Sequence, residues 1–177
     1  GTMNVSARTW NDALTLRSAT GQMNINGIQT MGANNLTISS DSNINIGANL
    51  TGTGVLTISS NAIATTMAVG TGQTGTIQID STELGSITDG WGNIIFGQTC
   101  GTGIINIGAA TWADNLTLTS NTGAINVNGA QTFNANNFTI TTNGDPAFAA
   151  AISGTGTFTV QAVTAATTIG IAGGAGT

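Results

Sequence analysis

The sequence repeats itself at a distance of 102 residues, and this regularity limits the folds open to it more than any other feature. Residues 1–75 align with residues 103–177 without a gap, and 31 of the 75 aligned positions are identical. The clearest match pairs residues 9–16 with residues 111–118, whereas residues 76–102 occur once. An ungapped match of this length means that every turn keeps its length, so the chain is built from equivalent structural units.

A shorter repeat of about twenty residues lies inside the long one. Triplets with a Thr between two apolar residues begin at Leu14, Leu36, Leu56, Leu116, Phe138 and Phe158, and looser versions begin at Ile77 and Ile94. Successive starts within one unit differ by 17 to 22 residues, which predicts five coils in each 102-residue unit. Alternation of apolar and polar residues with a period of two is typical of a strand with one buried face.

Short strands that recur in register about every twenty residues predict an all-β fold, the parallel β-helix or β-solenoid. We expect residues 1–177 to form a single continuous solenoid of about nine coils, roughly 40 Å long at ~4.8 Å per coil. No segment places apolar residues at helical spacing, so no helix is predicted. The Asn-Gly pairs at 26–27, 128–129 and 143–144 are expected at turns with positive φ.

Stacked coils bring equivalent side chains into lines along the outside of a solenoid. The predicted threonine ladder consists of Thr15, Thr37, Thr57, Thr117, Thr139 and Thr159. A second set of triplets predicts an asparagine ladder of Asn24, Asn45, Asn106 and Asn126. Like polar side chains stack favourably in register, while like charges on neighbouring strands repel, so the low charge of this chain suits such ladders.

Composition excludes several functions. The chain has two cations, Arg8 and Arg17, seven acidic residues and no His. Two cations cannot form a phosphate-binding surface, so no nucleic-acid partner is expected. Histidine catalysis and histidine metal ligation are excluded. The apolar runs are far shorter than the roughly 20 residues of a membrane-spanning helix, so no membrane insertion is predicted. The lone Cys100 is expected to be a small buried apolar residue.

A period near one hundred residues is also typical of tandem immunoglobulin-like sandwiches. The chain has no Tyr and only one Cys, so it lacks both the tyrosine corner and the paired cysteines of that fold. A sandwich also leaves the twenty-residue repeat unexplained. The solenoid is therefore the favoured prediction.

The coils, together with residues 87–97 and 101–108, resemble the repeat region of very large bacterial surface proteins of the filamentous-haemagglutinin-like adhesin class. The resemblance covers essentially the whole chain and implies a right-handed β-helical shaft, secreted to the bacterial cell surface and involved in cell adhesion. It implies as partners further repeats or like chains end to end, and glycans or proteins of a host or neighbouring cell. The family's Asn-Pro-Asn secretion motif has no counterpart, because Pro146 is the only proline. With about 1.7 repeat units, the chain is expected to be a fragment.

Two other functions stay open beside a non-catalytic shaft. Uncapped coils expose unpaired strand edges at both ends, which predicts a self-assembling extracellular filament or matrix protein as the alternative. Some solenoids cleave polysaccharides with clustered carboxylates. The closest group here is Asp80, Glu83 and Asp89. We expect these to be solvated turn residues, so the chain is predicted not to be an enzyme.

The remaining candidate sites have plain structural explanations. No calcium-binding Gly-Gly-x-Gly-x-Asp run occurs, so neither metal nor cofactor is expected. Asn35 and Asn137 are equivalent sequons and candidate glycosylation sites, although a turn Asn before an apolar-Thr strand produces this motif by chance. An ice-binding role for the threonine ladder is disfavoured because a second threonine rank is lacking. Trp10, Trp112 and Trp91 are expected to pack at corners of the coil.

Overall fold

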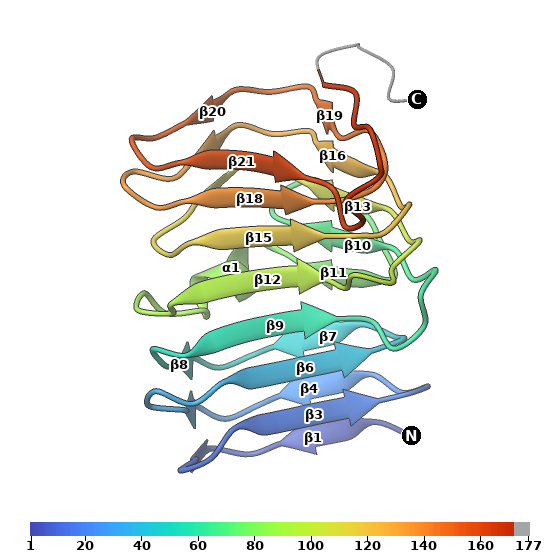
Figure 1. Ribbon diagram of the computed structural model, residues 1–177. Helices are drawn as coiled ribbons and strands as arrows, with labels where there is room; N and C mark the ends of the chain where they lie inside the picture. The colour runs from blue at the N-terminus through green and yellow to red at the C-terminus, as the bar shows by residue number, and fades with distance from the viewer. Residues whose placement is uncertain (172–177) are drawn as a thin grey trace.

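The chain forms a parallel β-solenoid, as the computed structural model of residues 1–171 shows (Figure 1). Its coils lie about 21 residues apart and make about eight turns, one fewer than the sequence pattern predicts. The chain runs left to right along the front in Figure 1, returns behind and rises toward the C-terminus, which is a right-handed turn. The predicted fold class is confirmed. Residues 172–177, the last part of the predicted solenoid, lie outside the described residues.

The front of the rod is one uninterrupted sheet of seven parallel strands. In stacking order these are β3 (Leu14–Ser18), β6 (Leu36–Ser40), β9 (Val55–Ser59), β12 (Asn93–Gly97), β15 (Leu116–Thr119), β18 (Phe138–Thr141) and β21 (Phe158–Gln161). Each of these strands except β12 carries a triplet with a Thr between two apolar residues, and in β12 the middle residue is Ile95. Alternate side chains therefore face inward. Leu36 and Ile38, the apolar members of one triplet, are fully buried.

The back of the rod consists of two sheets, a lower one of three strands and an upper one of five. The lower sheet contains β1 (Met3–Val5), β4 (Met23–Ile25) and β7 (Ile44–Ile46). The upper sheet contains, in stacking order, β11 (Ile77–Ile79), β10 (Met67–Val69), β13 (Ile105–Ile107), β16 (Ile125–Val127) and β19 (Ala147–Phe148). No strand of the lower sheet pairs with one of the upper sheet, so the back of the rod is interrupted between β7 and β11.

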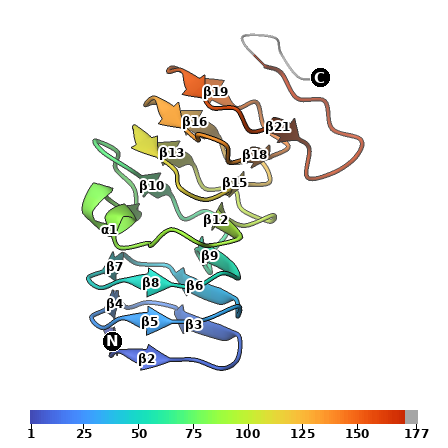
Figure 2. The ribbon, with the colours of Figure 1, turned by 90° about the vertical axis from the view of Figure 1, so that its left-hand side faces the viewer.

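A third face joins the back to the front and consists of two sheets of three short strands each, of which Figure 2 shows the lower one. Its lower sheet is β2 (Arg8–Thr9), β5 (Gln29–Thr30) and β8 (Leu50–Thr51), and its upper sheet is β14 (Ala110–Thr111), β17 (Gln131–Thr132) and β20 (Ile152–Ser153). Leu, Ile, Met, Val and Phe side chains from all three faces form one core along the rod. This core replaces the separate hydrophobic centre of a globular domain.

The prediction of five coils per 102-residue unit is wrong. The triplet at Ile77 does not join the front sheet but forms β11, which pairs with β10 on the back. Along the front, β9 is followed directly by β12, although 38 residues separate Leu56 from its register partner Ile94. Residues 67–97 therefore form a single long coil, called the irregular coil below. It contains β10, β11, α1 (Ser81–Gly85) and β12.

Candidate functional site

The front face carries the predicted threonine ladder in register. Strand pairing aligns Thr15, Thr37, Thr57, Thr117, Thr139 and Thr159. Ile95 of β12 interrupts the line between Thr57 and Thr117. The Thr side chains are half-buried, apart from Thr15 of β3, which is exposed. The face offers a line of neutral hydroxyls and methyl groups along the rod, without charged side chains in the line.

The predicted asparagine ladder is divided into two segments. In the lower segment Asn24 donates from Nδ2 to Oδ1 of Asn4 at 2.9 Å, and Asn45 aligns with Asn24. In the upper segment Asn126 donates to Asn106 at 2.9 Å. The two segments are separated because β11 and β10 lie between β7 and β13. A single ladder from Asn45 to Asn106 therefore does not exist.

The two Trp residues that are equivalent in the 102-residue repeat, Trp10 and Trp112, each donate a hydrogen bond to a buried glutamine of the next coil. Trp10 donates from its indole nitrogen to Oε1 of Gln29 at 2.8 Å, and Trp112 donates to Gln131 at 2.9 Å. The Gln131 amide in turn donates to the carbonyl oxygens of Gly108 and Gly129 at 2.6 and 2.7 Å. Sequence analysis missed these glutamines, although their 102-residue spacing could have drawn attention to them.

Trp91 is buried rather than displayed for a ligand. It is 2% exposed and donates from its indole nitrogen to the carbonyl oxygen of Leu50 at 3.3 Å. A Cβ atom on Gly52 would lie 2.7 Å from the Trp91 ring, so the ring fills the space that this glycine leaves. The Trp91 ring is therefore not available for a sugar to stack on.

The expectation that Asp80 and Glu83 are solvated turn residues is wrong for Glu83. Asp80 is the N-cap of α1, and its carboxylate accepts from the N–H groups of Thr82 and Glu83. Glu83 is 8% exposed and accepts from the N–H of Asp80 at 2.8 Å and from that of Ile46 at 3.0 Å. The Asp-x-x-Glu spacing is that of a capping box and could have revealed this helix.

Burial raises the pKa of Glu83, and the nearby charge of Asp80 adds to this effect. The hydrogen bonds from Asp80 and Ile46 act in the opposite direction, since they favour the ionised form. The carboxylate lies beside a polar hollow of about 420 Å³ between β7 and β11. The hollow is lined by Asn43, Asn45, Ile46, Gly47, Gln78, Asp80, Thr82 and Glu83.

A second acidic pair emerges only in the folded chain. Asp114 accepts from the N–H of Gly90 at 2.9 Å and is 7% exposed, whereas its repeat equivalent Asp12 is exposed. Burial raises the pKa of Asp114, and the neighbouring carboxylate of Asp89 raises it further. Residues 89 and 114 are far apart in sequence, so no local motif could have paired them.

The candidate glycosylation sites also have a structural role. Asn35 and Asn137 are exposed, and each accepts through Oδ1 from a backbone N–H of the next coil at 2.8 Å. The donors are Val55 and Thr157. The amide nitrogen, which is the atom that would carry a glycan, takes no part in these two bonds. Glycosylation of either residue stays a prediction.

Cys100 is exposed, contrary to the expectation that it is buried. It lies in the turn that follows β12.

Among the described residues, no three His, Cys, Asp or Glu side chains gather into a group able to hold a metal ion. Within residues 1–171 no helical segment has the length and apolar character needed to span a bilayer.

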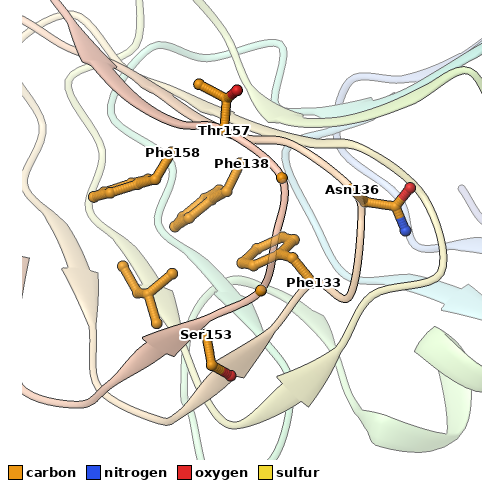
Figure 3. A pocket seen from close by; sticks show the side chains of 9 residues that line it. Phe133, Asn136, Phe138, Ser153, Thr157 and Phe158 are labelled. Atoms are coloured by element: carbon orange, nitrogen blue, oxygen red, sulfur yellow. The ribbon is translucent and has the colours of Figure 1, made fainter.

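An aromatic-lined hollow opens near the C-terminal end of the core (Figure 3). The rings of Phe133 and Phe138 stack with centroids 4.7 Å apart, and Phe138 and Phe158 stack at 5.2 Å. The hollow has a volume of about 130 Å³, and Phe158 is 43% exposed beside it. This is the interior of the solenoid at its last described coils rather than a separate cleft.

Comparison of the chain with protein-family models, with curated proteins and with solved structures gives no match.

Proposed function

We propose that this chain is a non-catalytic shaft segment of a large secreted bacterial cell-surface adhesin. The observation that carries the proposal is the unbroken front sheet, in which every strand from β3 to β21 pairs with its neighbours. A stack of this kind lengthens with each added coil while its cross-section stays constant. Its outer ladders are neutral, so neighbouring coils do not repel one another.

Such a shaft holds a binding tip away from the cell, and its own surface need not recognise a ligand. The buried Trp91 and the two Trp–Gln contacts are consistent with this role, because they stabilise the coil. The resemblance to filamentous-haemagglutinin-like adhesins supports secretion and a place on the cell surface. Attachment to glycans or proteins of other cells would then belong to the complete adhesin.

The shaft proposal can be tested by displaying one, three or six copies of residues 1–102 on a bacterial surface, each array ending in a peptide epitope. Capture by antibody-coated beads is expected to increase with copy number, because the epitope moves beyond the surrounding surface polysaccharide. Beads without antibody are the control. Capture that does not depend on copy number, or capture by glycan-coated beads without the epitope, would contradict the proposal.

The alternative is a self-assembling extracellular filament or matrix protein. It is favoured by the exposed Phe158 ring and by the outermost strands of the stack, β1 and β3 at one end and β19 and β21 at the other, each of which has one edge without a partner strand among residues 1–171. Open parallel edges template the addition of another chain. Negative-stain electron microscopy of the purified chain distinguishes the two functions. Long unbranched filaments of constant width support the alternative, and single short particles exclude it.

A further inference from the structure

The irregular coil adds fewer strands to the front of the rod than to the back. Its front contribution is the single strand β12, whereas its back contribution is two strands, β10 and β11. The front sheet therefore has seven strands, and the back has eight in its two sheets together. Because neighbouring strands lie ~4.8 Å apart, the back of the rod is longer by about that distance.

The order of the two back strands explains how the extra level arises. After β9 the chain enters β10, leaves a gap above β7, and then returns through β11 to fill that gap. The stacking order is thus β7, β11, β10 and β13, although β10 precedes β11 in sequence. Parallel pairing aligns Met67 with Ile77 and Val69 with Ile79, so both strands place apolar residues in the core.

The fit of β11 onto β7 depends on side chains instead of a backbone ladder. Glu83 accepts from the N–H of Ile46 at 3.0 Å, and Asn43 accepts from the N–H of Gln78 at 2.8 Å. On the third face, Leu50 of β8 pairs with Ile87 of the irregular coil through an isolated parallel bridge. These contacts hold β11 against β7, although the two strands belong to separate sheets.

We propose that the irregular coil is a built-in bend of the solenoid, with β11 acting as a wedge and Glu83 as the positioning residue that holds it in place. An extra ~4.8 Å on one of two faces about 10 Å apart turns the axis by about 25° toward the front sheet. Figure 2 shows the upper half leaning toward the side on which β12, β15 and β18 lie. The inference concerns the shape of this chain and holds whether or not it serves as a shaft.

The bend can be measured with pairs of nitroxide labels on the two faces, in a Cys100→Ser background. The front pair is Arg17→Cys with Gln161→Cys, which occupy the same register position of β3 and β21, and the back pair is Asn4→Cys with Ala147→Cys; all four positions are exposed. Six strand steps separate the front labels and seven separate the back labels. Pulsed electron–electron double resonance should therefore give a back distance about 5 Å longer than the front distance. Equal distances would overturn the proposal.

Two deletions make the test specific. Deleting residues 60–97 joins Ser59 of β9 to Gln98 and removes the irregular coil, so the front and back distances should become equal. Deleting residues 19–40 removes one regular coil and should keep the difference of about 5 Å, although both distances shorten. A difference that persists after deletion of 60–97, or disappears after deletion of 19–40, would show that the bend lies elsewhere.

Glu83 is tested without removing any coil. Glu83→Ala leaves the N–H of Ile46 without its carboxylate partner, so the distance distribution of the back pair should broaden. The front pair should keep its narrow distribution, since β9 and β12 remain paired through their backbones. The matched control is Thr82→Ala, an exposed residue of the same helix, which should leave both distributions unchanged. An unchanged back distribution in Glu83→Ala would exclude the positioning role.

Discussion

At the scale of single residues, buried polar contacts and close backbone packing hold neighbouring coils together. Gln131 is fully buried, accepts from Trp112, and donates to two glycine carbonyl oxygens. Buried polar groups are costly when they lose their partners. The same arrangement around Gln29 shows that the long repeat conserves contacts as well as strands.

Gln131→Leu is expected to lower the free energy of unfolding by about 3 kcal/mol, because it leaves an indole N–H and two carbonyl oxygens unpaired in the interior. Urea denaturation followed by circular dichroism measures this change. Gln161→Leu is the matched control, since Gln161 is exposed and donates only to Thr141. A loss below about 0.5 kcal/mol for Gln131→Leu would mean that water replaces the lost bonds.

The expectation of positive φ angles at the three Asn-Gly pairs is wrong. Positive φ angles occur instead at Gly32, Gly70, Gly72, Gly90, Gly97, Gly154 and Asn134. Gly27 and Gly129 are required for a different reason. A Cβ atom at either position would lie 2.0 Å from the backbone nitrogen of the coil below, at Ala7 or Ala109.

Gly129→Ala is therefore expected to destabilise the fold by about 3 kcal/mol or more, because backbone must move to admit the methyl group. Gly85→Ala is the control, since nothing lies within 4 Å of its added Cβ. That change in the short helix should be neutral or should stabilise by about 0.5–1 kcal/mol. Thermal and urea unfolding of the two variants compare these effects directly.

At the scale of secondary-structure elements, α1 shows how one short segment departs from the repeat. Its capping box turns the chain from β11 back toward β12 and buries Glu83 against β7. A regular coil needs no such element, because backbone pairing satisfies its edges. The helix is therefore coupled to the interruption between the two back sheets.

Glu83 gives α1 an expected pH dependence. Burial raises its folded-state pKa above 4.5, the ordinary value. Its contribution to stability is thus fully present below the unfolded pKa and is lost as pH rises through the folded pKa. We expect the free energy of unfolding of the wild type, relative to that of Glu83→Gln, to decrease as pH rises from 4.5, the ordinary pKa, through the raised folded-state pKa.

Urea titrations at several pH values test this expectation. Thr82→Ala should keep the pH dependence of the wild type, since it retains Glu83 and removes no ionisable group. A wild-type stability that rises with pH relative to Glu83→Gln would show that the hydrogen bonds from Ile46 and Asp80 outweigh burial.

At the scale of the whole molecule, the solenoid is a one-dimensional stack in which each coil contacts mainly its neighbours. Whole regular coils should be removable, whereas a partial coil should not. Deleting residues 19–40 removes one regular coil and aligns β3 beneath β9, with Leu14 facing Leu56. Deleting residues 19–30 removes about half a coil and breaks the alternation of faces.

The whole-coil deletion is expected to fold and to lower the urea m-value by about one eighth, in proportion to the surface lost. The half-coil deletion should lose cooperative unfolding, because its remaining strands cannot pair in register. Circular dichroism and urea denaturation measure both outcomes. Cooperative folding of the half-coil deletion would show that the stack tolerates changes of register.

How much the sequence predicts differs between regular and irregular coils. Apolar-Thr-apolar triplets at regular spacing predict parallel strands, because a period of two buries one face. They also place Thr15, Thr37 and Thr57 on one line, as strand pairing aligns them. The same reasoning fails at Ile77, whose triplet has the right pattern but lies on a different face.

The sequence by itself determines the parallel solenoid, its coil length and its neutral outer ladders, because these properties follow from local periodicity and from the cost of stacked charge. Only the tertiary structure decides the number of coils, the reversed order of β10 and β11, the burial of Glu83 and the pairing of Asp89 with Asp114. These features depend on which level of the stack a strand enters after a turn. That choice is made by the space and hydrogen-bonding partners that the preceding coils leave open, and a triplet pattern carries no information about them.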